Sequence, residues 1–150
     1  MNKKTIAILL FAFITLTGWA KEKTMVWEQP TTEYGTSYGD GFFNTALDIT
    51  KVELKETETL VYMTISRRSD YPDFSFQFVS DTYLKAADKR YALISVDGME
   101  LNQYTLTNKN GKLDVVFHFQ PLPQDTKSFD FIEGEIERAF QIKGIKPVEE

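Results

Sequence analysis

Residues 113–119 read Leu-Asp-Val-Val-Phe-His-Phe, and this stretch decides the fold class. Apolar side chains occupy every second position, and two of the three residues between them are polar. A period of two places alternate side chains on opposite faces of a β-strand, whereas a helix needs a period near 3.6. The stretch therefore predicts a strand with one buried face, which carries Phe117 and Phe119, and with His118 on the opposite face.

The same alternation recurs on both sides of this stretch. Residues 61–65 and 74–78 alternate in the same way, and residues 47–54 alternate with one slip near Lys51, which predicts a β-bulge. Asp97-Gly98 and Asn110-Gly111 are residue pairs that favour tight hairpin turns, because such turns need positive φ.

The pattern as a whole predicts an all-β domain. We find no sustained helical period with capping residues, no repeat and no linker. Many short strands at regular spacing favour an antiparallel β-sandwich, immunoglobulin-like, with about seven to nine strands. We expect this single β-sandwich domain to occupy residues 21–150.

The first 20 residues predict a cleaved signal peptide. Lys3 and Lys4 form a basic tip, an apolar run follows over residues 5–17, and Gly18-Trp19-Ala20 places small residues at the exit. The run is shorter than the about 20 residues of a membrane-spanning helix. We therefore expect an exported protein, periplasmic or secreted, whose mature chain begins at Lys21 and has no membrane span.

Charge and cysteine content exclude several classes of function. The chain has 17 basic and 22 acidic residues, and removal of Lys3 and Lys4 with the signal would leave a net charge of −7. An acidic chain is a poor ligand for nucleic acid. With no cysteine there is no thiol nucleophile, no Cys-ligated zinc, no redox pair and no lipid anchor. We expect no cofactor and no bound metal.

A glycine-rich loop with aromatic residues is the candidate ligand or partner contact. It spans residues 34–43 and contains Tyr34, Tyr38, Phe42 and Phe43. Aromatic side chains on such a loop offer flat apolar faces to a sugar ring or to a partner protein. The alternative is that Phe42 and Phe43 begin a strand and enter the core, with the tyrosines covering one end of the domain.

Other polar groups offer weaker hypotheses. Two carboxylates a few ångströms apart would suit a glycoside hydrolase. His118, the only histidine, has no partner that the sequence can place beside it, so we interpret it as an exposed or half-buried strand residue. The remaining candidates are the carboxylates Asp70, Asp73, Asp130, Glu133, Glu135 and Glu137, the calcium-type oxygens of Asp40, Asn44 and Asp48, and the anion-binding pair Arg67-Arg68.

Several short motifs resemble a secreted β-sandwich region of Bacteroides-type proteins. In that family the region often precedes a periplasmic thioredoxin-like thiol–disulfide oxidoreductase domain. The resemblance implies a β-sandwich in a bacterial periplasm. This chain ends at Glu150 and has no cysteine, so the redox function is not carried over. The matching residues are Val52-Glu53-Leu54, Thr57, Thr59, Tyr83-Leu84, Arg90-Tyr91, Pro121-Leu122-Pro123, Thr126, Phe129 to Gly134 and Gly144-Ile145, within a loose match from Trp27 to Ile145.

These observations predict a protein that binds and does not catalyse. Our first hypothesis is a non-enzymatic exported module that binds a partner protein of the cell envelope. The second is a carbohydrate-binding module that uses loop 34–43. The third is a hydrolase with a carboxylate pair. Fold class alone does not choose among them.

Overall fold

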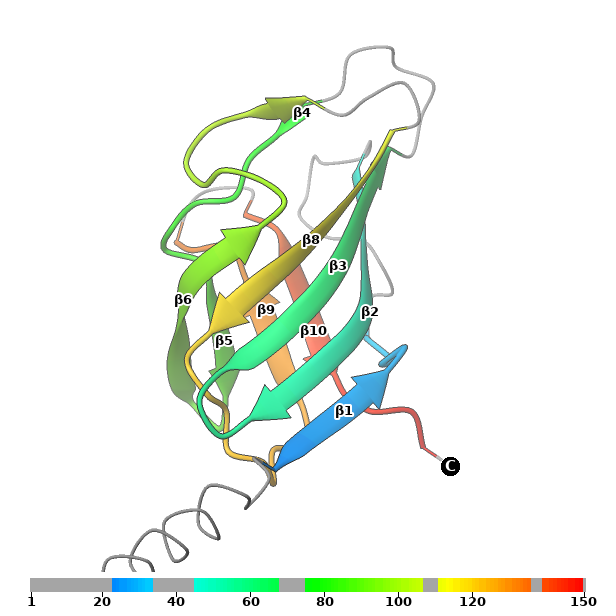
Figure 1. The fold of residues 1–150 in the computed structure, drawn as a ribbon, viewed down its shortest axis with the longest axis vertical. Helices are drawn as coiled ribbons and strands as arrows, with labels where there is room; N and C mark the ends of the chain where they lie inside the picture. Colours follow the sequence, from blue (N-terminus) through cyan, green and yellow to red (C-terminus); the bar gives the residue numbers. More distant parts are fainter. Residues whose placement is uncertain (1–22, 34–44, 68–74, 107–110, 136–138, 150) are drawn as a thin grey trace, which may run out of the picture.

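A computed structural model describes residues 23–33, 45–67, 75–106, 111–135 and 139–149. All regular structure in these ranges is β-strand, and every strand pair is antiparallel (Figure 1). The all-β prediction is confirmed. The strands are β1 (Thr24–Glu28), β2 (Thr45–Lys55), β3 (Thr59–Arg67), β4 (Ser75–Phe76), β5 (Tyr83–Ala86), β6 (Lys89–Asp97), β7 (Thr105–Leu106), β8 (Lys112–Phe119), β9 (Phe129–Ile132) and β10 (Gln141–Ile145).

Eight of these strands form one continuous sheet in the order β1-β2-β3-β8-β6-β5-β9-β10, and β4 pairs separately with β7. The sheet curls, so that β9 and β10 lie behind β3 and β8 (Figure 1). The two separate sheets of an immunoglobulin-like sandwich are therefore not confirmed. Their place is taken by two halves of one sheet, β1-β2-β3-β8 and β5-β9-β10, which β6 joins.

β6 forms the corner between the two halves. Its first residues, Lys89 to Ala92, pair with β5, and its later residues pair with β8. The pairing with β8 shifts register between Leu93 and Ser95, which leaves Ile94 as an extra residue. A bulge of this kind bends a strand and increases its twist, so one strand can serve both halves of a curled sheet.

The two edges of the sheet meet along a seam. β1 and β10 are the edge strands, and Thr31, just after β1, forms an antiparallel bridge with Lys146, just after β10. Inside the seam the Trp27 ring stacks on Phe129 with 5.7 Å between ring centroids. The curled sheet is thus tied edge to edge at this seam.

The core lies inside the curl and is rich in phenylalanine. Phe78 contacts four other rings, with centroid distances of 6.2 Å to Phe76, 5.1 Å to Phe117, 5.9 Å to Phe131 and 5.2 Å to Phe140. The predicted buried face of residues 113–119 is confirmed, since Phe117 and Phe119 are fully buried. Rings from both halves of the sheet therefore share one core.

The β2 bulge is confirmed, but the hairpin turns predicted at Gly98 and Gly111 were wrong. β2 shifts register between Ile49 and Lys51. Gly98 and Gly111 have positive φ as expected, yet neither closes a tight hairpin. The strand β7, which lies between these two glycines, pairs with β4, whereas β8 pairs with β3 on one side and with β6 on the other. The strand expected over residues 74–78 shrinks to the two residues of β4, and residue 74 lies outside the described ranges.

One tight hairpin turn lies where the sequence signal is weak. Ala87 and Asp88 connect β5 to β6, and both have positive φ. Positive φ costs alanine free energy, so this turn is held by the strand pairing on either side of it.

Candidate functional site

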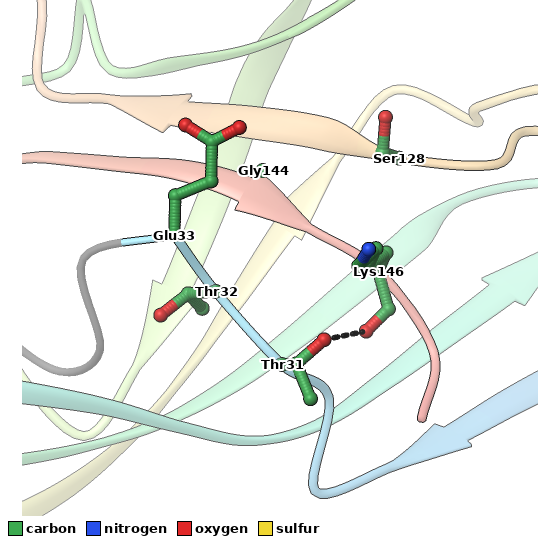
Figure 2. A pocket seen from close by; sticks show the side chains of 6 residues that line it. All are labelled: Thr31, Thr32, Glu33, Ser128, Gly144 and Lys146. Atoms are coloured by element: carbon green, nitrogen blue, oxygen red, sulfur yellow. Dashed lines mark hydrogen bonds between the residues drawn. The ribbon is translucent and has the colours of Figure 1, made fainter. Parts of the chain in front are cut away.

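A polar pocket of about 430 Å³ lies at the seam of the sheet (Figure 2). One wall is the chain that follows β1, and the other is the end of β10 with the residue before β9. Ser128 and Lys146 lie on the same side of the pocket, and Glu33 extends over Gly144 (Figure 2). The lining residues are Thr31, Thr32, Glu33, Ser128, Gly144 and Lys146.

Backbone hydrogen bonds fix the first wall against β10. Thr31 and Lys146 each donate an amide N–H to the other's carbonyl oxygen, at 2.9 and 3.0 Å. The Glu33 amide donates to the Lys143 carbonyl at 3.0 Å, and the Thr31 hydroxyl contacts the Lys146 carbonyl at 3.5 Å (Figure 2). The pocket wall is therefore anchored by backbone pairing.

A bulge in β10 shapes the floor of the pocket. Ile142 pairs with Phe131 and Ile145 pairs with Phe129, so two residues of β10 face Asp130 alone. The Asp130 carboxylate accepts the amide N–H of Gly144 at 2.9 Å. The expectation that Asp130 would cap a backbone amide is confirmed, and the amide belongs to this bulge.

Gly144 meets two requirements at once. Its φ is +63°, a conformation that glycine adopts without cost. A methyl group at this position would lie 2.5 Å from Cγ and 2.8 Å from Cδ of Glu33, well inside van der Waals contact. Glycine is therefore what allows the Glu33 side chain to lie across the bulge.

The side chains that line the pocket carry polar groups, although about half of the pocket surface is apolar. Its side chains supply three hydroxyl groups, one carboxylate and one ammonium group, and four of the six lining residues are exposed. Pockets for drug-like ligands have a similar volume but are mostly apolar. A pocket lined by hydrogen-bonding groups instead suits a ligand rich in hydroxyl, amide or charged groups.

The aromatic candidates cannot be placed by the structure. Tyr34, Tyr38, Phe42 and Phe43 lie outside the described residues. Their loop nevertheless continues directly from Glu33, which is a lining residue of the pocket. The arginine pair also lies outside what the structure describes, since Arg68 and the side chain of Arg67 are not among the described residues.

The carboxylates of the hydrolase hypothesis have distinct surroundings. Asp130 caps Gly144 as described above. Glu135 accepts a hydrogen bond from the Tyr83 hydroxyl at 2.9 Å and pairs with Arg90 at 2.8 Å. These two contacts lower the pKa of Glu135. Asp70, Asp73 and Glu137 lie outside the described residues.

Glu133, another carboxylate of the hydrolase hypothesis, is buried. Its side chain is 3% exposed, and burial raises its pKa to about 8. The amide N–H of Phe140 approaches its carboxylate at 3.4 Å and opposes that shift. A carboxyl group in this setting is largely protonated at neutral pH.

His118 is half-buried, as expected for the outer face of a strand, but it has two partners that the sequence did not reveal. Nδ1 lies 2.6 Å from Glu58 and Nε2 lies 2.7 Å from Asp97. Both ring nitrogens are therefore engaged, whereas a general base needs a free nitrogen that faces the substrate.

The structure gives no support to the calcium hypothesis. Asp48 lies on β2, while Asp40 and Asn44 lie outside the described residues. In the described ranges no group of three or more histidine, cysteine, aspartate or glutamate side chains is placed to hold a metal ion. Nor does any helix in these ranges have the length and hydrophobicity to cross a membrane.

Sequence reasoning missed the seam pocket because its parts are far apart in the chain. Thr31 and Lys146 are 115 positions apart, and nothing local marks them as neighbours. One signal was present, since an isolated glycine inside a strand pattern often marks a bulge or a close approach. Gly144 carried that signal.

Comparison with known proteins adds no relative to this picture. Searches against protein-family models, curated proteins and solved structures find no match for this chain. The resemblance to the secreted region of Bacteroides-type proteins stays a prediction from sequence.

Proposed function

We propose that this protein is an exported, non-enzymatic binding module and that the seam pocket is where its ligand or partner binds. The observation that carries the proposal is the pocket itself. It is an open hollow of about 430 Å³ with hydroxyl, carboxylate and ammonium groups, built on backbone pairing between two sheet edges. Such a site offers directional hydrogen bonds on a rigid support, which is what recognition of a polar ligand requires.

Several acid–base side chains are bonded to other groups of the protein, and this supports binding over catalysis. His118 has both ring nitrogens bonded to carboxylates, and Asp130 holds a backbone amide. Glu135 is paired with Tyr83 and Arg90. A catalytic pair would instead present one carboxyl and one carboxylate to a shared cavity. Export rests on the basic tip, apolar run and small-residue exit of residues 1–20.

The polar lining favours a carbohydrate over an apolar ligand as the second, more specific candidate. Sugar hydroxyls pair well with carboxylate, ammonium and hydroxyl side chains. Tyr34 follows Glu33 directly, so an aromatic ring for stacking is one residue away in sequence. A partner protein of the envelope remains the first candidate, because a polar hollow beside a sheet edge also accepts a peptide segment.

The test is a binding measurement on purified protein with a panel of neutral and anionic polysaccharides. We expect Glu33→Ala and Lys146→Ala to weaken glycan binding at least tenfold, because each removes a charged hydrogen-bonding group, while the melting temperature stays nearly unchanged. Lys112→Ala is the matched control, since Lys112 is an exposed lysine on β8 that does not line the pocket.

Three results separate the candidates. An envelope protein that binds the native chain but not the Lys146→Ala variant assigns the pocket to a protein partner. Loss of glycan binding on replacing Tyr34 and Tyr38 with alanine, at constant melting temperature, assigns these tyrosines to the contact. Polysaccharide turnover that disappears on changing Asp130, Glu133 or Glu135 contradicts the non-enzymatic proposal.

A further inference from the structure

The outer face of β8 carries the only histidine of the chain, between two carboxylates. His118 Nδ1 lies 2.6 Å from Oε1 of Glu58, and Nε2 lies 2.7 Å from Oδ2 of Asp97. An ionised carboxylate only accepts hydrogen bonds, so each contact needs an N–H on the ring. Neutral imidazole has one N–H, and imidazolium has two. Both contacts are therefore satisfied together only when the ring is doubly protonated.

These three residues come from three elements that meet at the corner of the sheet. Glu58 belongs to the turn between β2 and β3, and Asp97 is the last residue of β6. His118 pairs across the sheet with Ser95, the first residue after the β6 register shift. The corner at which β6 turns from β8 toward β5 thus lies beside the ring.

We propose that Glu58, His118 and Asp97 form a proton-dependent fastening of this corner. In the imidazolium form the ring holds the β2–β3 turn and the end of β6 to β8. Loss of one proton leaves a ring nitrogen lone pair facing a carboxylate, and that contact becomes repulsive. One of the two carboxylates then separates from the ring, and the corner loosens.

The charges around the ring favour the fastened form. Burial alone would lower the pKa of His118, but the hydrogen bonds and charges of Asp97 and Glu58 outweigh it and raise the pKa above its ordinary value of 6.5. A group whose pKa is raised on folding stabilises the fold below its ordinary pKa. This contribution disappears as the pH rises through the pKa in the folded protein. The fastening is therefore closed under mildly acidic conditions and opens under alkaline ones.

Other ionisable groups on this face are already engaged with one another. On β3, Tyr62 donates to Glu53 of β2 at 2.8 Å, and Lys51 lies 3.2 Å from the same carboxylate. Burial, the Glu53 hydrogen bond and the nearby carboxylates raise the pKa of Tyr62 to about 12, so it keeps its proton over the range in which His118 titrates.

On β8 itself, Asp114 accepts a hydrogen bond from Thr64 at 2.6 Å. Leu60, the residue on β3 directly opposite His118, carries no charge. Glu58 and Asp97 are therefore the groups that control the ring.

The test is a pH titration of the histidine ring by NMR on the purified protein. One histidine gives one set of ring signals, so no assignment is needed. We expect a midpoint above 6.5 and nitrogen shifts that show two N–H groups at pH 6. We also expect Glu58→Gln and Asp97→Asn each to lower the midpoint by about one pH unit, which is roughly a tenfold loss of proton affinity.

Asp114→Asn is the matched control, because Asp114 lies on the same face of β8 without contacting the ring. Its midpoint should equal that of the native protein. Amide hydrogen exchange, corrected for its intrinsic pH dependence, should show loss of protection above the midpoint in the segment Ser95 to Asp97, which pairs with β8. A native midpoint at or below 6.5, an equal shift in the control, or unchanged protection would overturn the proposal.

Discussion

The two halves of the sheet reach stability by different means. β2, β3 and β8 are long, and outside the β2 bulge most of their buried positions alternate with less buried ones, so each adds many ladder hydrogen bonds and a broad apolar face. β5, β9 and β10 have only four or five residues each, and β10 contains a bulge. The short half compensates with large buried rings and a capped bulge amide.

The difference shows where special residues are needed. In the long half the alternation of buried and less buried side chains is repeated along each strand, so a change at one position leaves the alternation intact elsewhere. The short half depends on individual residues, namely Asp130, Glu133 and Gly144, whose roles do not repeat. The candidate pocket lies at the seam, where the bulged strand β10 of the short half meets the chain that follows β1.

The largest expected effect tests whether the halves share one core. We expect Phe117→Ala in the long half and Phe131→Ala in the short half each to lower the free energy of unfolding by about 3–5 kcal/mol. Both rings are fully buried, and their centroids lie 5.1 Å apart. Chemical denaturation should show one transition for each variant. Ile94→Ala is the control, since Ile94 is 61% exposed and should change stability by less than about 0.5 kcal/mol. Two separate transitions would mean that the halves unfold independently.

A smaller effect tests the special role of Gly144. We expect Gly144→Ala to cost about 1–3 kcal/mol, because alanine meets a positive φ there and its methyl group meets Glu33. In the Glu33→Ala background the cost should fall to about 1 kcal/mol, the part due to φ alone. Thermal denaturation of the two single variants and the double variant measures the coupling. An identical cost in both backgrounds would contradict the close approach of Glu33 to the bulge.

The last effect concerns Glu133 and, unlike the others, depends on pH. Its pKa is raised from 4.5 to about 8 on folding, so it costs no stability below pH 4.5 and progressively more as the pH rises toward 8. We expect Glu133→Gln to remove this loss, which the pKa shift places at up to about 5 kcal/mol at pH 8, and to be more stable than the native protein at that pH. Melting temperatures at pH 5 and pH 8 are the measurement. Glu135→Gln, at an exposed neighbour, is the control. A native protein whose stability does not fall between these values would contradict the raised pKa.

The long half could be predicted from the sequence, and the short half only in part. The alternation of residues 113–119 and 61–65 gave the right buried faces, because a period of two has a direct geometric meaning. The slip near Lys51 gave the right bulge for the same reason. Phe129 and Phe131 were correctly placed on one face, but four residues do not reveal which strands they join.

The failures have a common physical cause, which is dependence on distant partners. Asp97-Gly98 has the composition of a hairpin turn, but β6 finds its partners in β5 and β8, so pairing overrides the turn signal. Ala87 takes a positive φ that its own chemistry disfavours, because the strands on both sides hold it there. Glu58 is 60 residues from His118, and no pattern along the chain connects them.

The bridge between Thr31 and Lys146 also has a consequence for the order of folding. It closes a loop of 115 residues. Closing a long loop lowers the entropy of the chain before the new contact can stabilise it. During synthesis the N-terminal strands emerge first, so Thr31 has no partner until the last strand arrives. A chain truncated before residue 141 would retain the residues that pair β2, β3 and β8 but would lack Gly144 and Lys146. The seam pocket is thus formed only after β10 has folded against the chain that follows β1.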